Sequence, residues 1–155
     1  MSGGSLKVMQ KFLYIAMISA LCLSLFSNCD KQKKTGHRLE GDWELVTFGK
    51  TDWEGLTEYA TSLTGTLTFN EYNSDSSYYS LKVTSDLVQS NGNIDQNGTY
   101  KIIEKGNYMY VSTIDAQGTL TSYTKYRILT LNSTDLQLEF TSADGYYHMM
   151  IFRKK

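Results

Sequence analysis

The sequence predicts an all-β domain folded as an eight-stranded antiparallel up-and-down β-barrel. Apolar and polar residues alternate with period two along most of the chain, and short clusters of Gly, Asn, Asp and Ser separate the alternating segments. The 155 residues are 41% hydrophobic and include 12 Tyr but no Pro, which suits one globular domain. Closing the sheet removes its edges, and the short C-terminal turns leave no room for the crossing connection of a Greek-key sandwich.

Residues 1–28 have the features of a secretory signal peptide. Lys7 and Lys11 precede an uncharged run of 17 residues, 12–28, whereas a membrane-spanning helix usually needs ~20 apolar residues. Met1 and Met9 are both candidate start residues. We therefore expect residues 1–28 to lie outside the folded domain.

The uncharged run ends at Phe26-Ser27-Asn28-Cys29, which resembles a bacterial lipobox. In that motif a cysteine that follows small residues is acylated, with palmitate-type chains, and becomes the mature N-terminus. The resemblance implies lipidation at Cys29, and an ordinary cleaved signal or a retained anchor are the alternatives. Several acyl chains, at ~0.8 kcal/mol per buried methylene, would make the attachment effectively permanent.

Residues 29–38 are expected to form the lipidated cysteine and a polar tether, followed by the barrel domain, 39–155. Residues 30–38 contain four basic residues and one acidic residue, whereas the chain from residue 39 onward contains nine basic and fifteen acidic residues. The overall formal charge of −1 argues against nucleic acid as a partner. His37, in the tether, is expected to be solvated.

The early connections between the predicted strands are long, and the later ones are short hairpins, which favours the up-and-down barrel. We expect a short helix over residues 53–63, because Leu56, Tyr59, Ala60 and Leu63 recur at helical spacing, with an irregular loop as the alternative. The strands themselves are expected at 42–48, 64–70, 78–84, 98–104, 108–113, 120–129, 135–141 and 146–153.

Three short motifs resemble those of the lipocalins. Gly41-Asp42-Trp43 opens the first strand like a G-x-W motif, Thr134-Asp135 stands where lipocalins often carry Thr-Asp-Tyr, and Arg153 ends the last strand. Together with the lipobox, these motifs resemble the lipocalin-like lipoproteins of the Bacteroidetes. The resemblance implies that Arg153 covers the Trp43 indole where the barrel closes. Such a cation–π contact would contribute ~0.5–2 kcal/mol, and Gly41 would let the chain pass closely.

The abundant tyrosines indicate what the barrel could hold, because a tyrosine offers an apolar ring and a hydroxyl that needs a partner. An open barrel would have a ligand cavity of a few hundred Å³. A barrel filled by its own side chains is the alternative. The residues expected to line the ligand are Leu67, Phe69, Tyr79, Leu81, Tyr100, Tyr110, Tyr126 and Phe140.

Catalytic and metal-binding signals are weak, so we expect no enzyme activity, no cofactor and no metal. Cys22 and Cys29 both precede the folded part, which excludes a cysteine-based zinc site there. The segment 93–98 with Glu104 is close to an EF-hand loop, but an ordinary turn entering a strand explains it better. His148 has no partner at metal-ligand spacing and is expected to be structural.

The sequence thus predicts a non-enzymatic lipoprotein of the cell envelope, anchored to the outer membrane on its periplasmic face or at the cell surface. Its barrel is expected to bind a small apolar or amphipathic ligand. The alternative is a structural or interaction protein with a filled barrel. It would contact a protein or glycan through the exposed aromatic residues Trp53, Tyr59, Tyr72 and Tyr78. An enzyme on the same barrel would need His148 and a carboxylate in one cleft.

Overall fold

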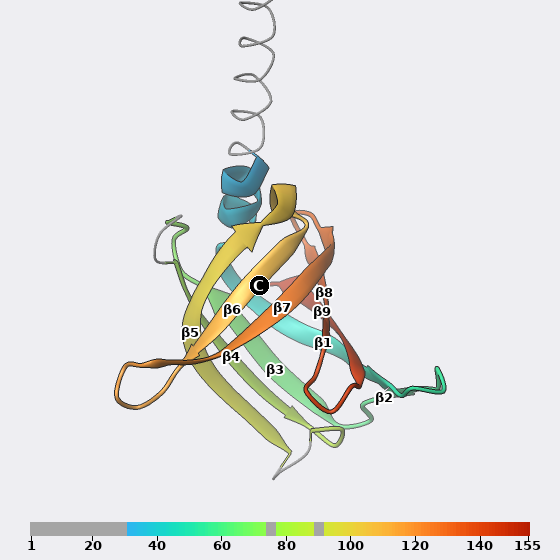
Figure 1. Cartoon of the computed structure of the whole chain (residues 1–155). Helices are drawn as coiled ribbons and strands as arrows, with labels where there is room; N and C mark the ends of the chain where they lie inside the picture. Colours follow the sequence, from blue (N-terminus) through green and yellow to red (C-terminus); the bar gives the residue numbers. More distant parts are fainter. Residues whose placement is uncertain (1–30, 74–76, 89–91) are drawn as a thin grey trace, which may run out of the picture.

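The computed structural model describes residues 31–73, 77–88 and 92–155, and shows a closed antiparallel barrel (Figure 1). Neighbouring strands follow the order β2-β1-β3-β4-β5-β6-β7-β8-β9, and β1 also pairs with β9. Eight strands close the ring, which confirms the predicted fold, and the short β2 is an addition. The elements are β1 (Gly41–Thr51), β2 (Thr57–Tyr59), β3 (Leu63–Phe69), β4 (Ser77–Ser85), β5 (Asn93–Ile103), the 3₁₀ turn η1 (Glu104–Gly106), β6 (Tyr108–Ile114), β7 (Leu120–Leu131), β8 (Asp135–Thr141) and β9 (Tyr147–Lys154).

The first and last strands of the ring pair along nearly their whole length, as the closed barrel requires. The register runs from Trp43 opposite Lys154 to Thr51 opposite Tyr147, with one shift at the bulge between Leu45 and Thr47. All the other strand pairs are also antiparallel. The ring therefore has no open edge between β1 and β9.

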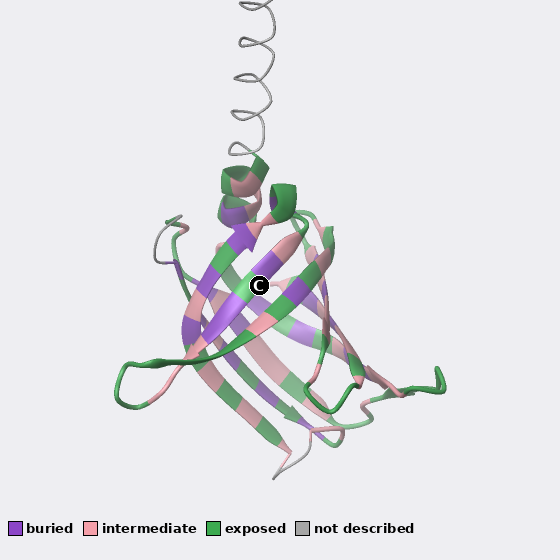
Figure 2. Ribbon diagram, in the orientation of Figure 1, coloured by how far each residue is buried: buried purple, intermediate pink, exposed green. Residues whose placement is uncertain are grey.

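Inward-facing side chains alternate with exposed ones along the strands (Figure 2). In β4 every second residue from Ser77 to Ser85 is buried. This pattern is the period-two signal that predicted the strands, since successive side chains point to opposite faces of a sheet. The largest fully buried side chains come from five strands and the segment before β1: Trp43, Phe69, Phe152, Leu39, Ile102, Leu136, Leu138 and Met150.

The helix predicted over residues 53–63 is wrong, because this segment forms a turn followed by β2. The Asp52 carboxylate accepts hydrogen bonds from the backbone N–H groups of Glu54 and Leu56, both at 2.9 Å, and so stabilises the turn. Leu56 and Tyr59 are 63% and 56% exposed. Only Ala60 and Leu63 of the predicted apolar stripe pack against the core, so the stripe does not act as one helical face.

Within the segment expected to form the tether, the described residues are helical, and this helix, residues 31–39, stands at one end of the barrel (Figure 1). Leu39 is fully buried, and the indole N–H of Trp43 donates a 2.7 Å hydrogen bond to its carbonyl oxygen. The predicted signal peptide and Cys29 lie outside the described residues. Within the described part of the chain, no helix combines the length and the apolar character that crossing a bilayer needs.

Candidate functional site

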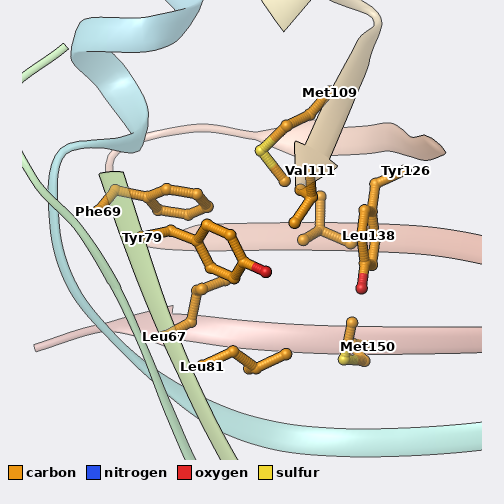
Figure 3. Close-up of a pocket in the computed structure, with 9 residues that line it drawn as sticks. All are labelled: Leu67, Phe69, Tyr79, Leu81, Met109, Val111, Tyr126, Leu138 and Met150. Carbon is orange, nitrogen blue, oxygen red and sulfur yellow. The ribbon is translucent and has the colours of Figure 1, made fainter. Parts of the chain in front are cut away.

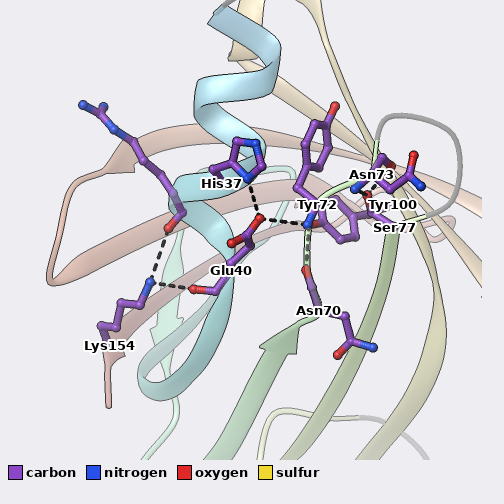
Figure 4. A network of polar contacts seen from close by, with 9 residues as sticks. His37, Glu40, Asn70, Tyr72, Asn73, Ser77, Tyr100 and Lys154 are labelled. Atoms are coloured by element: carbon purple, nitrogen blue, oxygen red, sulfur yellow. Dashed lines mark hydrogen bonds and ion pairs between the residues drawn. The ribbon is translucent and has the colours of Figure 1, made fainter.

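A polar network seals the helix end of the barrel (Figure 4). Glu40 Oε1 lies 2.6 Å from His37 Nδ1 and accepts a 2.8 Å hydrogen bond from the backbone N–H of Tyr72. Lys154 Nζ donates to the carbonyl oxygen of Glu40 at 2.6 Å. Burial alone would raise the pKa of Glu40, but the hydrogen bonds from Tyr72 and His37 outweigh it and hold this pKa below its usual value.

The cover predicted for Trp43 comes from Lys154 and not from Arg153. Lys154 Nζ lies 4.8 Å from the Trp43 ring centroid, and the two residues are register partners. Arg153, one position earlier, faces the opposite side of the sheet, where it is exposed opposite Glu44. The alternation of side chains along a strand therefore assigns the contact to Lys154.

Side chains from several strands surround a small cavity in the interior beneath this end (Figure 3). The cavity at its centre has a volume of about 10 Å³, room for roughly one water molecule. This cavity is far smaller than the expected ligand cavity of a few hundred Å³. Nine side chains line this space: Leu67, Phe69, Tyr79, Leu81, Met109, Val111, Tyr126, Leu138 and Met150.

Five of the eight residues predicted to line the interior do so, namely Leu67, Phe69, Tyr79, Leu81 and Tyr126. The four that the prediction missed lie at alternating inward positions of β6, β8 and β9, so strand periodicity could have identified them.

The other three predicted lining residues lie elsewhere. Tyr100 is buried against Phe69, with ring centroids 4.8 Å apart, next to the sealed end. Tyr110 is 43% exposed on the outer face of β6, so its prediction as a lining residue is wrong. Phe140 is half-buried and stacks on His148, with centroids 4.8 Å apart, at the opposite end of the barrel.

Two buried polar atoms in the described interior have no hydrogen-bond partner, the hydroxyl of Tyr79 and Nδ1 of His148. Burial raises the pKa of Tyr79, and the neighbouring Thr113 hydroxyl opposes this rise without meeting hydrogen-bond geometry. Burial together with Tyr79 raises the pKa of Tyr126. Both phenols are therefore neutral at physiological pH.

His148 lies between two phenylalanine rings. It stacks on Phe140 and, at 5.7 Å between centroids, on Phe48, while its Nε2 lies 2.9 Å from Ser142 Oγ. The Ser142 hydroxyl also donates to Asp144, so the carboxylate contacts the serine and not the imidazole. This order differs from a Ser-His-Asp triad, in which the carboxylate orients the histidine.

The segment that resembled an EF-hand loop is part of a strand. Residues 93–103 form β5, so the side chains of Asn93 and Asp95 point outward along an extended chain and do not encircle an ion. The Asp95 carboxylate instead forms an ion pair with Lys82 of β4, with 3.8 Å between Oδ2 and Nζ. Among the described residues, no group of three or more His, Cys, Asp or Glu side chains is placed to hold a metal.

The larger concavity lies on the outside of the barrel wall, and we call it the outer hollow. It has a volume of about 510 Å³ and opens to solvent. The hairpin between β6 and β7 stands away from the barrel beside it (Figure 1). Its lining residues are Asn70, Tyr78, Tyr79, Ser80, Asn97, Gly98, Ile114, Asp115 and Ala116.

Gly98 allows β5 and β6 to approach each other closely at the floor of the outer hollow. A Cβ atom at this position would overlap the carbonyl oxygen of Ser112 on β6, so only glycine fits. β5 pairs with β6 from Gly98 onward, while the earlier part of β5 pairs with β4 alone. A concavity that depends on where one strand pair ends has no direct signal in the sequence.

The aromatic residues predicted to be exposed lie on separate elements. Trp53, 86% exposed, and Tyr59 belong to the excursion between β1 and β3. Tyr78 is 49% exposed on β4, in the outer hollow. Tyr72 is half-buried in the sealed end, where its ring contacts those of His37 and Tyr100. They do not gather on one element as a single contact surface.

Comparison with known proteins supports the fold. No family model matches the chain, and no curated protein matches it. A redesigned β-barrel, mFAP1, bound to DFHBI, aligns with a TM-score of 0.51 and 13% identity, over 77% of this chain and 98% of that chain. A fluorescence-activating β-barrel designed de novo aligns with a TM-score of 0.50 and 15% identity, over 78% of this chain and 97% of that chain.

The complex of bovine odorant binding protein with a selenium-containing odorant aligns less closely, with a TM-score of 0.46 and 14% identity, over 77% of this chain and 72% of that chain. At such identities the two designed barrels establish the class of the fold and nothing finer. The chain is thus an up-and-down β-barrel with one sealed end, a filled core and a concavity on its outer wall.

Proposed function

We propose that this chain is a lipid-anchored, lipocalin-like binding module of the cell envelope, without enzymatic activity, that holds a small amphipathic molecule in the outer hollow. The observation that carries the proposal is the contrast in volume. The outer hollow, at about 510 Å³, is within the range of small-molecule sites, whereas the core, at about 10 Å³, is far below it.

The lining of the outer hollow suits a molecule with both polar and apolar parts. Tyr78, Ile114 and Ala116 supply apolar surface, and Ser80 and Asn97 supply hydrogen-bonding groups. Barrels of this class are compatible with small ligands, since the designed barrel mFAP1 is bound to DFHBI. The N-terminal cysteine would keep this binding surface at a membrane.

Binding of a small molecule in the outer hollow is tested by identifying the compounds that co-purify with the full chain. Ala116 and Ala143 are both exposed, at equivalent positions of turns that are closed by hydrogen bonds from the N–H groups of Gly118 and Gly145 respectively. Ala116→Trp should fill the outer hollow, and the matched Ala143→Trp should not. We expect mass spectrometry of extracted small molecules to show a compound that Ala116→Trp loses and Ala143→Trp retains. A compound retained by both variants, or none in the unmodified chain, would contradict the proposal.

The anchor is tested by fractionating cells that express cysteine variants. Cys29→Ala should move the protein from the membrane fraction to the soluble fraction and remove the mass of the acyl chains. Cys22→Ala, in the middle of the uncharged run, is the control and should leave both unchanged. Membrane association that survives Cys29→Ala would argue for the retained anchor.

A second candidate function rests on the excursion between β1 and β3. Trp53, Leu56 and Tyr59 are 86%, 63% and 56% exposed, an unusual concentration of apolar surface for one short segment. This segment could contact a protein partner. Crosslinking in cells would favour this function if a partner seen with the unmodified chain were lost in a Trp53→Ser variant that still folds.

A further inference from the structure

We propose that the outer hollow recognises a neutral saccharide. The inference rests on the function proposed above and names the chemical class of its ligand. It follows from three properties of the described lining: unused hydrogen-bonding groups, one accessible aromatic ring, and the absence of any cationic side chain.

The first property is the hydrogen-bonding capacity of the wall. Within the described part of the chain, the side chains of Asn70, Ser80 and Asn97 make no hydrogen bond to another described residue. Ser80 and Asn97 are register partners on β4 and β5, so their side chains stand next to each other on the outer face. An amide offers a donor and an acceptor together, a combination that matches the neighbouring hydroxyl groups of a sugar ring.

The second property is the aromatic ring of Tyr78. It is 49% exposed, although it lies in a concave part of the wall, and it is the neighbour of Thr99 in the β4–β5 register. The apolar face of a sugar ring can pack on such a ring while the hydroxyl groups at its rim meet the amides. Ile114 and Ala116 extend the apolar surface on the hairpin side.

The third property is charge, and it decides between saccharides and other polar ligands. None of the nine lining residues is Lys, Arg or His, so nothing in the wall balances a phosphate or a carboxylate. Asp115 is the one acid, and its Oδ1 already accepts the backbone N–H groups of Gln117 and Thr119 at 3.0 and 2.8 Å. A single carboxylate does not make a cation site either. The lining therefore favours a neutral ligand with many hydroxyl groups over an anion or a metal ion.

The inference is tested by NMR titration of the full chain with named sugars. Glucose, galactose, mannose and N-acetylglucosamine are the neutral probes, glucuronic acid is the anionic probe, and decanol is the apolar probe. We expect at least one neutral sugar to shift the backbone amide signals of Ser80, Asn97 and Ala116. Glucuronic acid should bind roughly tenfold more weakly than glucose, because its carboxylate finds no cation.

Variants separate recognition from a general surface effect. Tyr78→Ala should weaken sugar binding roughly tenfold, whereas Tyr110→Ala removes a similarly exposed ring on β6, outside the outer hollow, and should not change it. Asn97→Asp keeps the shape but removes the donor and adds a charge, and should weaken binding as well.

The outcomes distinguish this inference from the proposed function. If none of the four neutral sugars shifts these signals, or if glucuronic acid or decanol binds better, the saccharide inference is wrong. The co-purification result with Ala116→Trp would still decide whether the outer hollow holds a small molecule. Equal weakening by Tyr78→Ala and Tyr110→Ala would also contradict the inference.

Discussion

At the scale of single residues, the interior is notable for two polar atoms that lack partners among the described residues. The Tyr79 hydroxyl faces a cavity walled by leucine, methionine and other apolar side chains, and His148 Nδ1 is enclosed between phenylalanine rings. A buried polar atom that makes no hydrogen bond carries its full desolvation cost, about 1–3 kcal/mol. Both atoms should therefore affect the stability of the fold.

Tyr79→Phe should increase the free energy of unfolding by about 1 kcal/mol, because it removes a buried hydroxyl without breaking a hydrogen bond. Tyr100→Phe is the matched control. Its hydroxyl donates a 3.4 Å hydrogen bond to the carbonyl oxygen of Asn70, so its loss should be neutral or destabilising. Urea denaturation measures both. A destabilised Tyr79→Phe variant would mean that this hydroxyl has a partner, namely Thr113, a water molecule or a ligand.

The protonation of His148 follows from its neighbours. The Ser142 hydroxyl has one hydrogen, and both Asp144 and the carbonyl oxygen of Tyr146 are acceptors for it. Ser142 Oγ must then accept from His148, so the neutral imidazole carries its hydrogen on Nε2 and a lone pair on Nδ1. Burial lowers the pKa of His148, Asp144 opposes this shift and Lys50 adds to it.

Stability should consequently fall as the pH drops. A histidine whose pKa is lower in the folded state stabilises the fold above its unfolded pKa of about 6.5, and this contribution is lost as the pH falls toward the folded value. We expect the free energy of unfolding to decline as the pH falls below about 6.5, before the carboxylates titrate. His148→Phe, which keeps a ring between Phe48 and Phe140, should flatten the decline. An unchanged slope in that variant would contradict this account.

At the scale of elements, two segments show why the sequence predicted strands better than helices. The helical segment 31–39 has four basic residues and a glycine, with no apolar stripe, so nothing in the pattern indicated a helix. It is stabilised by contacts with remote residues, through Leu39 in the core and Gly36 against the ring of Tyr72. Residues 53–63 have the stripe, but only Ala60 and Leu63 pack against the core, while Leu56 and Tyr59 stay exposed.

Gly36→Ala tests the docking of this helix. Alanine is the better helix former by about 1 kcal/mol, but here its Cβ would overlap the Tyr72 ring. We expect the helix to separate from the barrel, with a net loss of about 1–3 kcal/mol in stability and faster hydrogen exchange over residues 31–39. Lys33→Ala, at an exposed position of the same helix, should show neither effect. Increased stability of Gly36→Ala would contradict the packing described here.

At the scale of the whole molecule, the sequence was sufficient for the architecture and insufficient for the site. Period-two alternation is a local property and predicted the eight strands. The pairing of the first strand with the last was predicted from the short C-terminal turns and from the removal of sheet edges on closure. The volume inside the barrel depends on how Met109, Tyr126 and Met150 fill it together, which no local pattern specifies. The outer hollow depends on the end of the β5–β6 pairing at Gly98, again a tertiary property.

The closure of the ring predicts different losses of stability when two adjacent basic residues are replaced. Lys154→Ala should cost about 1–2 kcal/mol, because it removes the contact with Trp43 and the hydrogen bond to the Glu40 carbonyl oxygen. Arg153→Ala, at an exposed position, should stay within about 0.5 kcal/mol of the unmodified chain. Thermal and urea unfolding measure both. A larger loss for Arg153→Ala would restore the contact that the lipocalin motifs imply.

The pairing of β1 with β9 also sets an order of events in time. Hairpins such as β3–β4 and β8–β9 join neighbouring segments and can form while the chain is still being made. The ring cannot shut until Tyr147–Lys154 has emerged, since only this last segment reaches Gly41–Thr51 along its length. Any chain interrupted before that point would present two bare strand edges, so aggregation of nascent protein is the hazard that this topology creates during synthesis.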